Sequence, residues 1–196
     1  MAMVSEEQQN LYDETYRALG LFVVRFAGLL YSLETSTVFL ITPMGYGPEG
    51  LLMQAALADR TAGPIVSSFF SVFYKKWEGH LTDEDIAILK NLRRELDEIV
   101  MKRNRLMHSA WMYSSGENRS DPIPLSTLRV RAHGKGMEFE SKKYLPEEID
   151  SLCDDCERLS SVVNRAVFRH FDAGQPAPNL SNRIRLEDGK ANSHPG

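Results

Sequence analysis

The chain has 196 residues, of which 42% are hydrophobic and 26% charged, and its formal net charge is −4 at pH 7. This length suits one domain with its own core, and the composition is that of an ordinary globular protein. The acidic balance excludes a broad polyanion-binding surface, because such surfaces depend on an excess of Lys and Arg. Any contact with nucleic acid is therefore expected to be local.

Several features favour a cytoplasmic protein. Cys153 and Cys156 are the only cysteines, too few for the disulfide scaffold of a small secreted domain. Residues 1–10 lack the basic and then apolar pattern of a signal peptide. The longest apolar segments, 19–33 and 65–73, contain polar or glycine interruptions and are shorter than a typical membrane-spanning helix. We therefore expect a cytoplasmic chain that does not enter a membrane.

The spacing of apolar residues predicts five helices. The first and the fourth repeat apolar residues at steps of three and four, and the third has a strongly aromatic face. Thr82 followed by Asp85 is typical of an N-cap, and Pro48 and Pro146 are typical of a first helical turn. The predicted helices cover residues 6–39, 49–59, 65–77, 83–107 and 145–171.

Between the last two helices the pattern changes to an alternation typical of strands. Residues 128–132 and 137–141 alternate on either side of the turn His133-Gly134-Lys135-Gly136, which indicates an antiparallel hairpin. Residues 110–113 are also strand-like, so 110–141 is predicted to be a small β insertion. After residue 172 the chain is rich in Gly, Pro and polar residues.

These elements predict an all-α, or mainly α, fold. One helical domain is expected over residues 1–172, with the β insertion at 110–141 following the fourth helix. Residues 173–196 offer little apolar surface to bury, so they are predicted to form a flexible tail.

The end of the fourth predicted helix carries Arg103, Asn104 and His108. Guanidinium groups bind phosphate, amides orient other groups, and imidazoles transfer protons near neutral pH. Residues four apart on a helix differ by roughly 40° in direction, but residues five apart differ by about 140°. Asn104 and His108 therefore share a face. Arg103 points elsewhere unless the helix ends before His108 or a second protomer supplies its own copy.

The segment Arg103-Asn104-Arg105-Leu106-Met107-His108 resembles the Arg-Asn-x-x-x-His signature of the HEPN (higher eukaryotes and prokaryotes nucleotide-binding) superfamily. In that superfamily the motif ends one helix of an α-helical bundle, and members often dimerise so that two motifs meet in one cleft. The resemblance covers residues 6–172 as architecture but only the motif as residue identity. It implies an HEPN-like helical bundle and a homodimer.

The resemblance also implies an activity, that of a metal-independent endoribonuclease without a cofactor. A ribose 2′-hydroxyl would attack the adjacent phosphate, with His108 as acid and base and Arg103 stabilising the developing charge. Asn104 would orient His108 or the phosphate. DNA lacks that hydroxyl and would be a poor substrate. HEPN resemblance is associated with toxin–antitoxin and antiviral defence systems, so RNA, a second copy and a protein antitoxin or regulator are the implied partners.

Three further residues are weaker candidates for substrate binding. Glu34 is similar to the polar position that many HEPN first helices direct toward their cleft, although a solvent-exposed position fits equally well. Lys102 and Arg105 lie in a run of alternating charges, which is more often a solvated helix face than an RNA track. Cys153 and Cys156 have no further ligand pair nearby, so no metal site is expected.

Two other interpretations of the motif stay open. In the first, the chain is a non-catalytic HEPN-like module that binds a nucleotide, an RNA or a protein. In the second, it is a helical interaction protein in which the motif is accidental and His108 caps backbone carbonyls at a helix end. Assays of RNA cleavage and RNA binding separate these interpretations.

Overall fold

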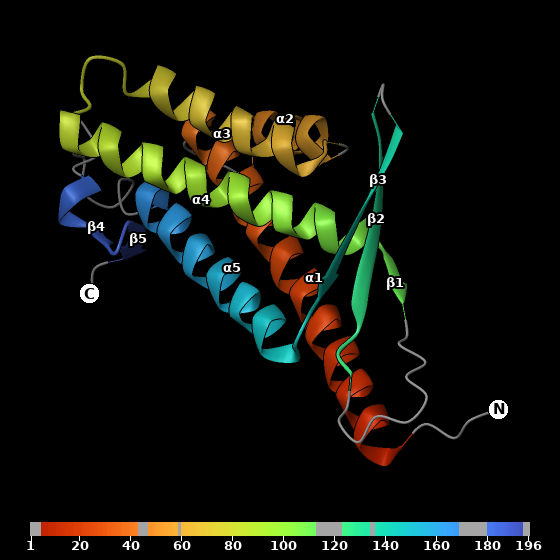
Figure 1. Ribbon diagram of the computed structural model, residues 1–196. Coiled ribbons are helices and arrows are strands. Elements are labelled where there is room, and N and C mark those ends of the chain that lie inside the picture. Colours follow the sequence, from red (N-terminus) through yellow and green to blue (C-terminus); the bar gives the residue numbers. More distant parts are fainter. Residues whose placement is uncertain are drawn as a thin grey trace. The chain divides into compact units, whose positions relative to one another are not determined.

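The computed structural model describes residues 5–42, 47–58, 60–112, 123–133, 136–168 and 180–193. Within these ranges the chain is mainly helical, with five α-helices and two small antiparallel sheets (Figure 1). The prediction of a mainly α fold with five helices is confirmed. The helices are α1 (Glu6–Ile41), α2 (Pro48–Ala58), α3 (Ala62–Lys76), α4 (Asp83–Met107) and α5 (Pro146–Val167).

Side chains cap the starts of α4 and α5, and the predicted cap of α4 is confirmed. The backbone N of Asp85 donates to Thr82 Oγ1 over 3.2 Å, while Asp85 Oδ2 accepts a bond of 3.0 Å from the backbone N of Thr82. This reciprocal pair satisfies donors that a helix start leaves without intrahelical partners. Asp85 Oδ1 also accepts a bond of 2.8 Å from the backbone N of Leu180. At α5, Glu148 accepts a bond of 3.0 Å from the backbone N of Leu145.

The chain divides into two compact units, where the sequence predicts one helical domain. The first unit comprises Met1–Arg25 and Met101–Asp154, and the second comprises Phe26–Val100 and Asp155–Gly196. Each of α1, α4 and α5 contributes residues to both units.

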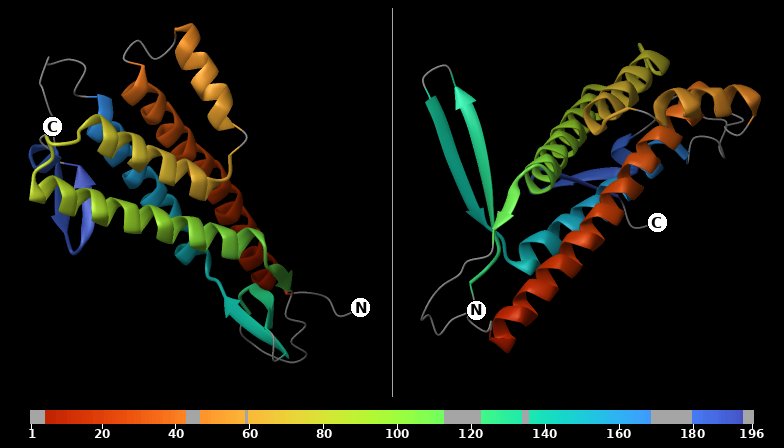
Figure 2. Two further views of the ribbon diagram at one scale, coloured as in Figure 1. Left: turned by 90° about the horizontal axis from the view of Figure 1, so that it is seen from above. Right: turned by 90° about the vertical axis from the view of Figure 1, so that its right-hand side faces the viewer.

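The first unit contains a three-stranded antiparallel sheet in the order β1-β2-β3, with β1 at Ala110–Met112, β2 at Ser126–His133 and β3 at Gly136–Lys143. β2 and β3 form a long hairpin in which Val130 lies opposite Phe139 (Figure 2). β1 pairs only with the base of β2. The β insertion therefore follows the motif helix as predicted, and its last strand continues two residues beyond the expected boundary at residue 141.

The core of the second unit is built around the aromatic face of α3. Phe69, Phe70 and Phe73 are fully buried, and the centroids of the Phe69 and Phe70 rings lie 5.2 Å apart in an edge-to-face arrangement. Such pairs combine the burial of large apolar surfaces with favourable ring electrostatics. Apolar residues of the neighbouring helices in this unit are also buried, among them Leu29 and Leu33 of α1, Leu89, Leu92 and Leu96 of α4, and Leu159 and Val163 of α5.

Residues 180–193 differ from the flexible tail expected for residues 173–196. They form a 3-10 turn, Leu180–Asn182, followed by the antiparallel strands β4 (Ile184–Glu187) and β5 (Lys190–Ser193). Asp188 and Gly189, which join the strands, have φ angles of +50° and +74°, as a two-residue type I′ turn requires. The side chains of Leu180, Ile184 and Ala191 are buried. Residues 173–179 and 194–196 lie outside the described residues.

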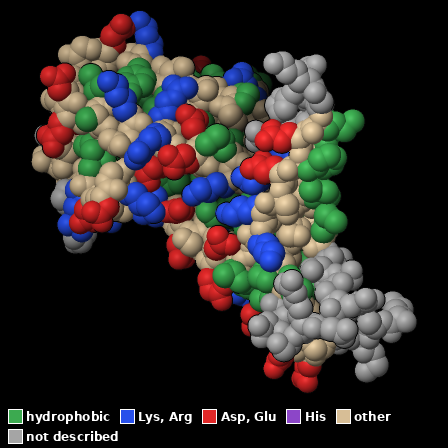
Figure 3. Space-filling model, in the orientation of Figure 1, with side chains coloured by type: hydrophobic (Ala, Val, Ile, Leu, Met, Phe, Trp, Pro, Cys, Tyr) green, Lys and Arg blue, Asp and Glu red, His purple; other side chains and the backbone are tan. Residues whose placement is uncertain are grey.

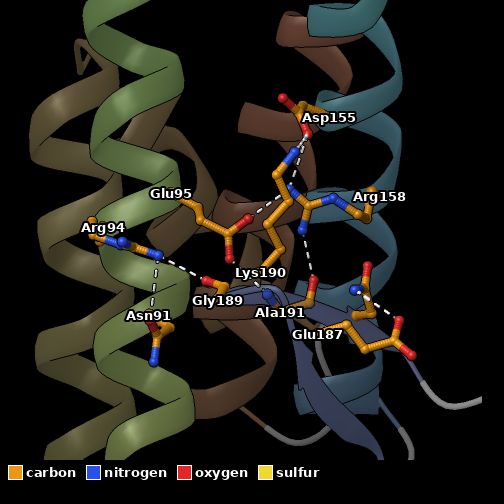
Figure 4. A network of polar contacts seen from close by, with 10 residues as sticks. Asn91, Arg94, Glu95, Asp155, Arg158, Glu187, Gly189, Lys190 and Ala191 are labelled. Atoms are coloured by element: carbon orange, nitrogen blue, oxygen red, sulfur yellow. Dashed lines mark hydrogen bonds and ion pairs between the residues drawn. The ribbon is translucent and has the colours of Figure 1, made fainter.

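A polar network holds this C-terminal hairpin against α4 and α5 within the second unit (Figure 4). Glu95 Oε2 lies 2.6 Å from Arg158 Nη2, and Glu95 Oε1 accepts a bond of 2.7 Å from the backbone N of Ala191. Arg158 Nη1 donates to the backbone O of Ala191 over 2.6 Å. Lys190 Nζ lies 3.3 Å from Asp155 Oδ1. A segment with little apolar surface is thus held through its backbone by charged side chains.

Part of α1 is long and apolar enough to cross a membrane, by length and composition alone. This differs from the expectation that no apolar segment reaches that length. The reason is that Arg25 and Gly28 interrupt the segment but leave its mean hydropathy high enough for a membrane-spanning helix. A mostly buried core helix of a soluble protein and a signal sequence near the N-terminus share these properties, and 28% of this apolar window is buried. The segment therefore does not by itself assign a membrane location.

Candidate functional site

The predicted motif lies at the C-terminal end of α4, in the first unit. Arg103 and Asn104 are half-buried, whereas His108 is exposed directly after the last helical residue, Met107. The backbone N of His108 still donates to the backbone O of Asn104 over 3.1 Å. Helical spacing therefore extends as far as His108.

This backbone geometry separates Arg103 from His108. At ideal helical spacing, residues five apart such as Arg103 and His108 differ in direction by about 140°, whereas Asn104 and His108, four apart, share a face. Arg103 Nη1 donates to Asn104 Oδ1 over 3.2 Å, so the guanidinium and the amide are in contact. α4 does end before His108, one of the two ways in which Arg103 and His108 were expected to meet, but the backbone bond from His108 to Asn104 keeps helical spacing through this residue. The other way requires a second protomer.

Two neighbouring side chains cap the end of α4. Ser109 Oγ donates to the backbone O of Arg105 over 2.6 Å, and Trp111 Nε1 donates to the backbone O of Leu106 over 3.0 Å. They satisfy carbonyl groups that a helix end leaves without intrahelical partners. Among the residues that the structure describes, none forms a hydrogen bond with the His108 ring. Ser109 and Trp111 thus fill the capping role that was one interpretation of His108.

Arg105 links the motif to the hairpin. Its Nη2 atom lies 2.7 Å from Glu140 Oε1 of β3, and the two side chains are 29% and 35% exposed. The pair neutralises a guanidinium that the sequence offered as a weak substrate-binding candidate. Lys102, the neighbouring weak candidate, is exposed to solvent. Leu106, between Arg105 and His108, is fully buried and anchors this end of the helix.

Glu34, the remaining weak candidate, lies on the part of α1 that belongs to the second unit. It is half-buried, and burial raises the pKa of its carboxyl group. It is not part of the group of residues that the first unit assembles around the end of α4.

The structure adds Glu140 and Tyr144 to the surroundings of the motif, and sequence reasoning missed both. The Tyr144 ring centroid lies 5.8 Å from that of Trp111, and Lys142 Nζ lies 4.4 Å from the Tyr144 ring. Burial raises the pKa of Tyr144, although the charge of Arg105 opposes the shift. For Glu140, the alternation along β3 was the available signal in the sequence, because it places Glu138 and Glu140 together on one face of the strand.

The assembled groups suit proton transfer and phosphate binding. An exposed imidazole shares a helix face with an amide, and that amide contacts a guanidinium. No group of three or more His, Cys, Asp or Glu residues is placed to hold a metal ion in the described parts of the chain. Neither a family model, nor a curated protein, nor a solved structure matches this chain. The functional argument therefore depends on the motif and its geometry.

Proposed function

We propose that this protein is a metal-independent endoribonuclease of the HEPN type, whose site is completed by a second copy of the chain. The observation that carries the proposal is the setting of His108. Its imidazole is exposed at the end of α4, on the face of Asn104, and no described residue forms a hydrogen bond with it. The helix end is capped by other side chains, so this histidine is available to a substrate.

The roles of the three residues follow from their chemistry. His108 takes the proton from the ribose 2′-hydroxyl as that oxygen attacks the adjacent phosphorus, and an imidazolium returns a proton to the departing 5′-oxygen. Arg103 stabilises the negative charge that develops on the phosphate oxygens. Asn104 contacts Arg103 and shares the face of His108, so it positions one group or the other. The products are a 2′,3′-cyclic phosphate and a 5′-hydroxyl.

A second copy supplies what one copy lacks. Arg103 and His108 of one helix diverge by about 140°, too much to contact one phosphate from the same side. A twofold axis near the end of α4 brings Arg103 of each copy toward His108 of the other. We therefore include a homodimer in the proposal.

The test is cleavage of labelled single-stranded RNA by the purified protein in excess chelator. We expect cyclic-phosphate ends, loss of cleavage in His108→Ala and Arg103→Ala, and no cleavage of an oligonucleotide that has 2′-deoxyribose throughout. His80→Ala and Arg93→Ala are matched controls, because His80 is also an exposed histidine and Arg93 lies on the same helix. Equal cleavage by wild type and His108→Ala would overturn the proposal. RNA binding without cleavage would favour the non-catalytic module.

The proposed setting is the cytoplasm, in a toxin–antitoxin or antiviral defence system. The chain lacks a broad basic surface that would attract RNA in general. The proposal therefore includes a protein antitoxin or regulator that covers His108 and controls access of RNA to it. Recovery of cleavage after such a protein is removed is the corresponding measurement.

A further inference from the structure

The positive charge of this acidic chain is concentrated in one segment. Residues 101–143, from the last turns of α4 to the end of β3, contain nine Lys and Arg residues and four Asp and Glu residues. The segment therefore has a formal charge of +5, whereas the rest of the chain has −9. A polyanion is repelled by most of the chain and attracted by this segment, which belongs entirely to the first unit.

The two faces of the β2–β3 hairpin differ in polarity. Val130 and Phe139 lie opposite each other on one face and are 51% and 66% exposed. The other face, which we call the inner hairpin face, is polar. Residues paired across an antiparallel sheet share a face. The described residues of the inner hairpin face are Thr127, Arg129, Glu138, Glu140 and Lys142.

The inner hairpin face adjoins the end of α4. Glu140 Oε1 lies 2.7 Å from Arg105 Nη2, which joins the third strand of the sheet to the motif helix. Figure 3 shows hydrophobic side chains along one side of the hairpin and charged side chains on the side of α4. The positive segment thus brings two elements together, a helix end and a polar sheet face.

Arg129 has no carboxylate partner on this face. It is half-buried, and among the residues that the structure describes none forms an ion pair with its guanidinium. The carboxylate opposite it in the register, that of Glu140, is bonded to Arg105. A guanidinium taken partly out of water needs acceptors, and its planar fork fits two oxygens of a phosphate. Arg129 is therefore suited to an anion that a ligand brings.

The geometry of α4 places His108 next to the inner hairpin face. Residues three apart on an α-helix differ in direction by roughly 60° and are neighbours on its surface. Lys102, Arg105 and His108 follow one another at this spacing, and the backbone bond from His108 to Asn104 extends the spacing through the histidine. The exposed Lys102 and His108 therefore flank Arg105, the residue that contacts the hairpin.

We propose that the inner hairpin face binds the RNA strand beside the cleavage site, with Arg129 and Lys142 contacting phosphates next to the scissile one. The inference rests on the proposed function for the identity of the ligand. Lys142 Nζ lies 3.6 Å from Glu148 Oε1, and the two side chains are 43% and 47% exposed. Such a surface pair contributes little, so a phosphate can take the place of the carboxylate.

The position of the cations favours a phosphate backbone over an acidic protein segment. They continue from the hairpin to Lys102 on the helix surface that carries His108, so a phosphate held by Arg129 is followed along the strand by one that the imidazole reaches. Contacts to phosphates fix the position of a strand and carry no sequence information. We therefore expect the inner hairpin face to position RNA without selecting its sequence.

Binding of a labelled single-stranded oligonucleotide with 2′-deoxyribose throughout tests the proposal without cleavage. This probe keeps every phosphate, and it is titrated with the full chain at several salt concentrations. Arg129→Gln should weaken binding about tenfold at low salt, and Lys142→Gln should weaken it less, because Lys142 is more exposed. Each lost phosphate contact should also reduce the slope of log affinity against log salt by about 0.7.

Two substitutions outside the positive segment are matched controls. Arg185→Gln removes an exposed arginine from β4, and Lys75→Gln removes a lysine that is paired with Glu78 as Lys142 is paired with Glu148. Both should bind the probe as the wild type does. Arg129→Lys keeps the charge and should restore the salt slope, while its affinity stays lower because an ammonium group lacks the planar fork. Thermal unfolding of each variant verifies that it is folded.

The cleavage assay gives a second measurement for the same residue. A phosphate contact beside the scissile bond holds substrate and transition state equally. Arg129→Gln should therefore raise KM about tenfold and leave kcat nearly unchanged. A fall in kcat with unchanged KM would overturn the positioning role.

The binding experiment has three outcomes that overturn the proposal. The first is a wild-type chain that does not bind the probe, and the second is equal binding by the wild type, Arg129→Gln and Lys142→Gln. The third is binding of poly-glutamate, but not of the oligonucleotide, that depends on Arg129, which would assign the face to an acidic protein. The proposed function fails separately, through equal RNA cleavage by wild type and His108→Ala.

Discussion

Glu95 of α4 and Arg158 of α5, 63 positions apart in the chain, form an ion pair in which Oε2 and Nη2 are 2.6 Å apart. The Glu95 side chain is 7% exposed and that of Arg158 is 21% exposed. Both side chains also bind the backbone of Ala191, one through its N and the other through its O. Two helices and a strand of the second unit thus depend on one pair of charges.

Glu95→Ala is expected to destabilise the second unit strongly. The substitution leaves the buried backbone N of Ala191 without an acceptor and removes one of the two carboxylates that pair with Arg158, so it should cost about 2 kcal/mol. The free energy of unfolding in denaturant measures this cost. Asp97→Ala is the control, since its pair with Arg93 on the same helix is about half exposed and should contribute less than about 1 kcal/mol. Equal effects of the two substitutions would contradict the structural role of Glu95.

Asp155 gives this network a pH dependence. Burial alone raises the pKa of the carboxyl group, but hydrogen bonds from Arg158 and Lys190, with their positive charges, outweigh burial and hold it below its ordinary value. A carboxyl group whose folded-state pKa is depressed adds stability above its unfolded-state pKa, about 4, and loses it as pH falls through the folded-state pKa. Asp155→Asn should therefore lower the free energy of unfolding at pH 7 and make its acid-side decline shallower.

Unfolding curves measured across the acid range provide the test. Asp154→Asn removes the same charge from the exposed neighbouring residue and serves as the control. Parallel pH profiles for wild type and Asp155→Asn would show that the network does not depress this pKa.

Gly189 is required by the turn between β4 and β5. Its φ of +74° lies in the left-handed region, where a side chain costs about 1–2 kcal/mol. A Cβ atom at this position would lie 3.6 Å from Arg94 Nη2, an ordinary contact, so space is not the limit. Gly189→Ala should lower the free energy of unfolding by about 1 kcal/mol. Gly20→Ala, within α1 and with nothing near the added Cβ, should raise it by about 0.5–1 kcal/mol. Changes of the same sign at both positions would contradict the backbone argument.

The sequence predicted the helices because their signals are local. The apolar spacing of α1, the aromatic face of α3 and the pair of Thr82 and Asp85 at the start of α4 depend only on neighbouring residues. The C-terminal hairpin also carried a local signal, since Asp188-Gly189 between alternating residues is typical of a two-residue turn. The polar composition of the segment nevertheless led to the prediction of a flexible tail, because such a segment has little apolar surface to bury. The hairpin is held by bonds from charged side chains to its backbone together with the buried side chains of Leu180, Ile184 and Ala191.

The surroundings of the motif could be predicted only in part. Arg103, Asn104 and His108 are recognisable as a set because they are consecutive or one turn apart on a helix. The pairing of Arg105 with Glu140 depends on the register of the hairpin relative to α4, which no local pattern fixes. The role of Glu95 likewise depends on residues 63 and 96 positions away.

Mixing two inactive variants tests whether the proposed site takes Arg103 from one copy and His108 from the other. A heterodimer of Arg103→Ala and His108→Ala contains one site lacking both residues and one site with both intact, because a twofold axis pairs each residue with its partner across the interface. Random exchange makes about half of the dimers heterodimers, each with one of two sites restored, so about a quarter of wild-type cleavage should return.

Mixing should be done by dilution and reconcentration, with the double variant Arg103→Ala and His108→Ala mixed into wild type as the control. That control can only dilute intact sites. If the two single variants stay inactive together although exchange is shown by differently sized tags, both residues act within one copy and the shared site is wrong.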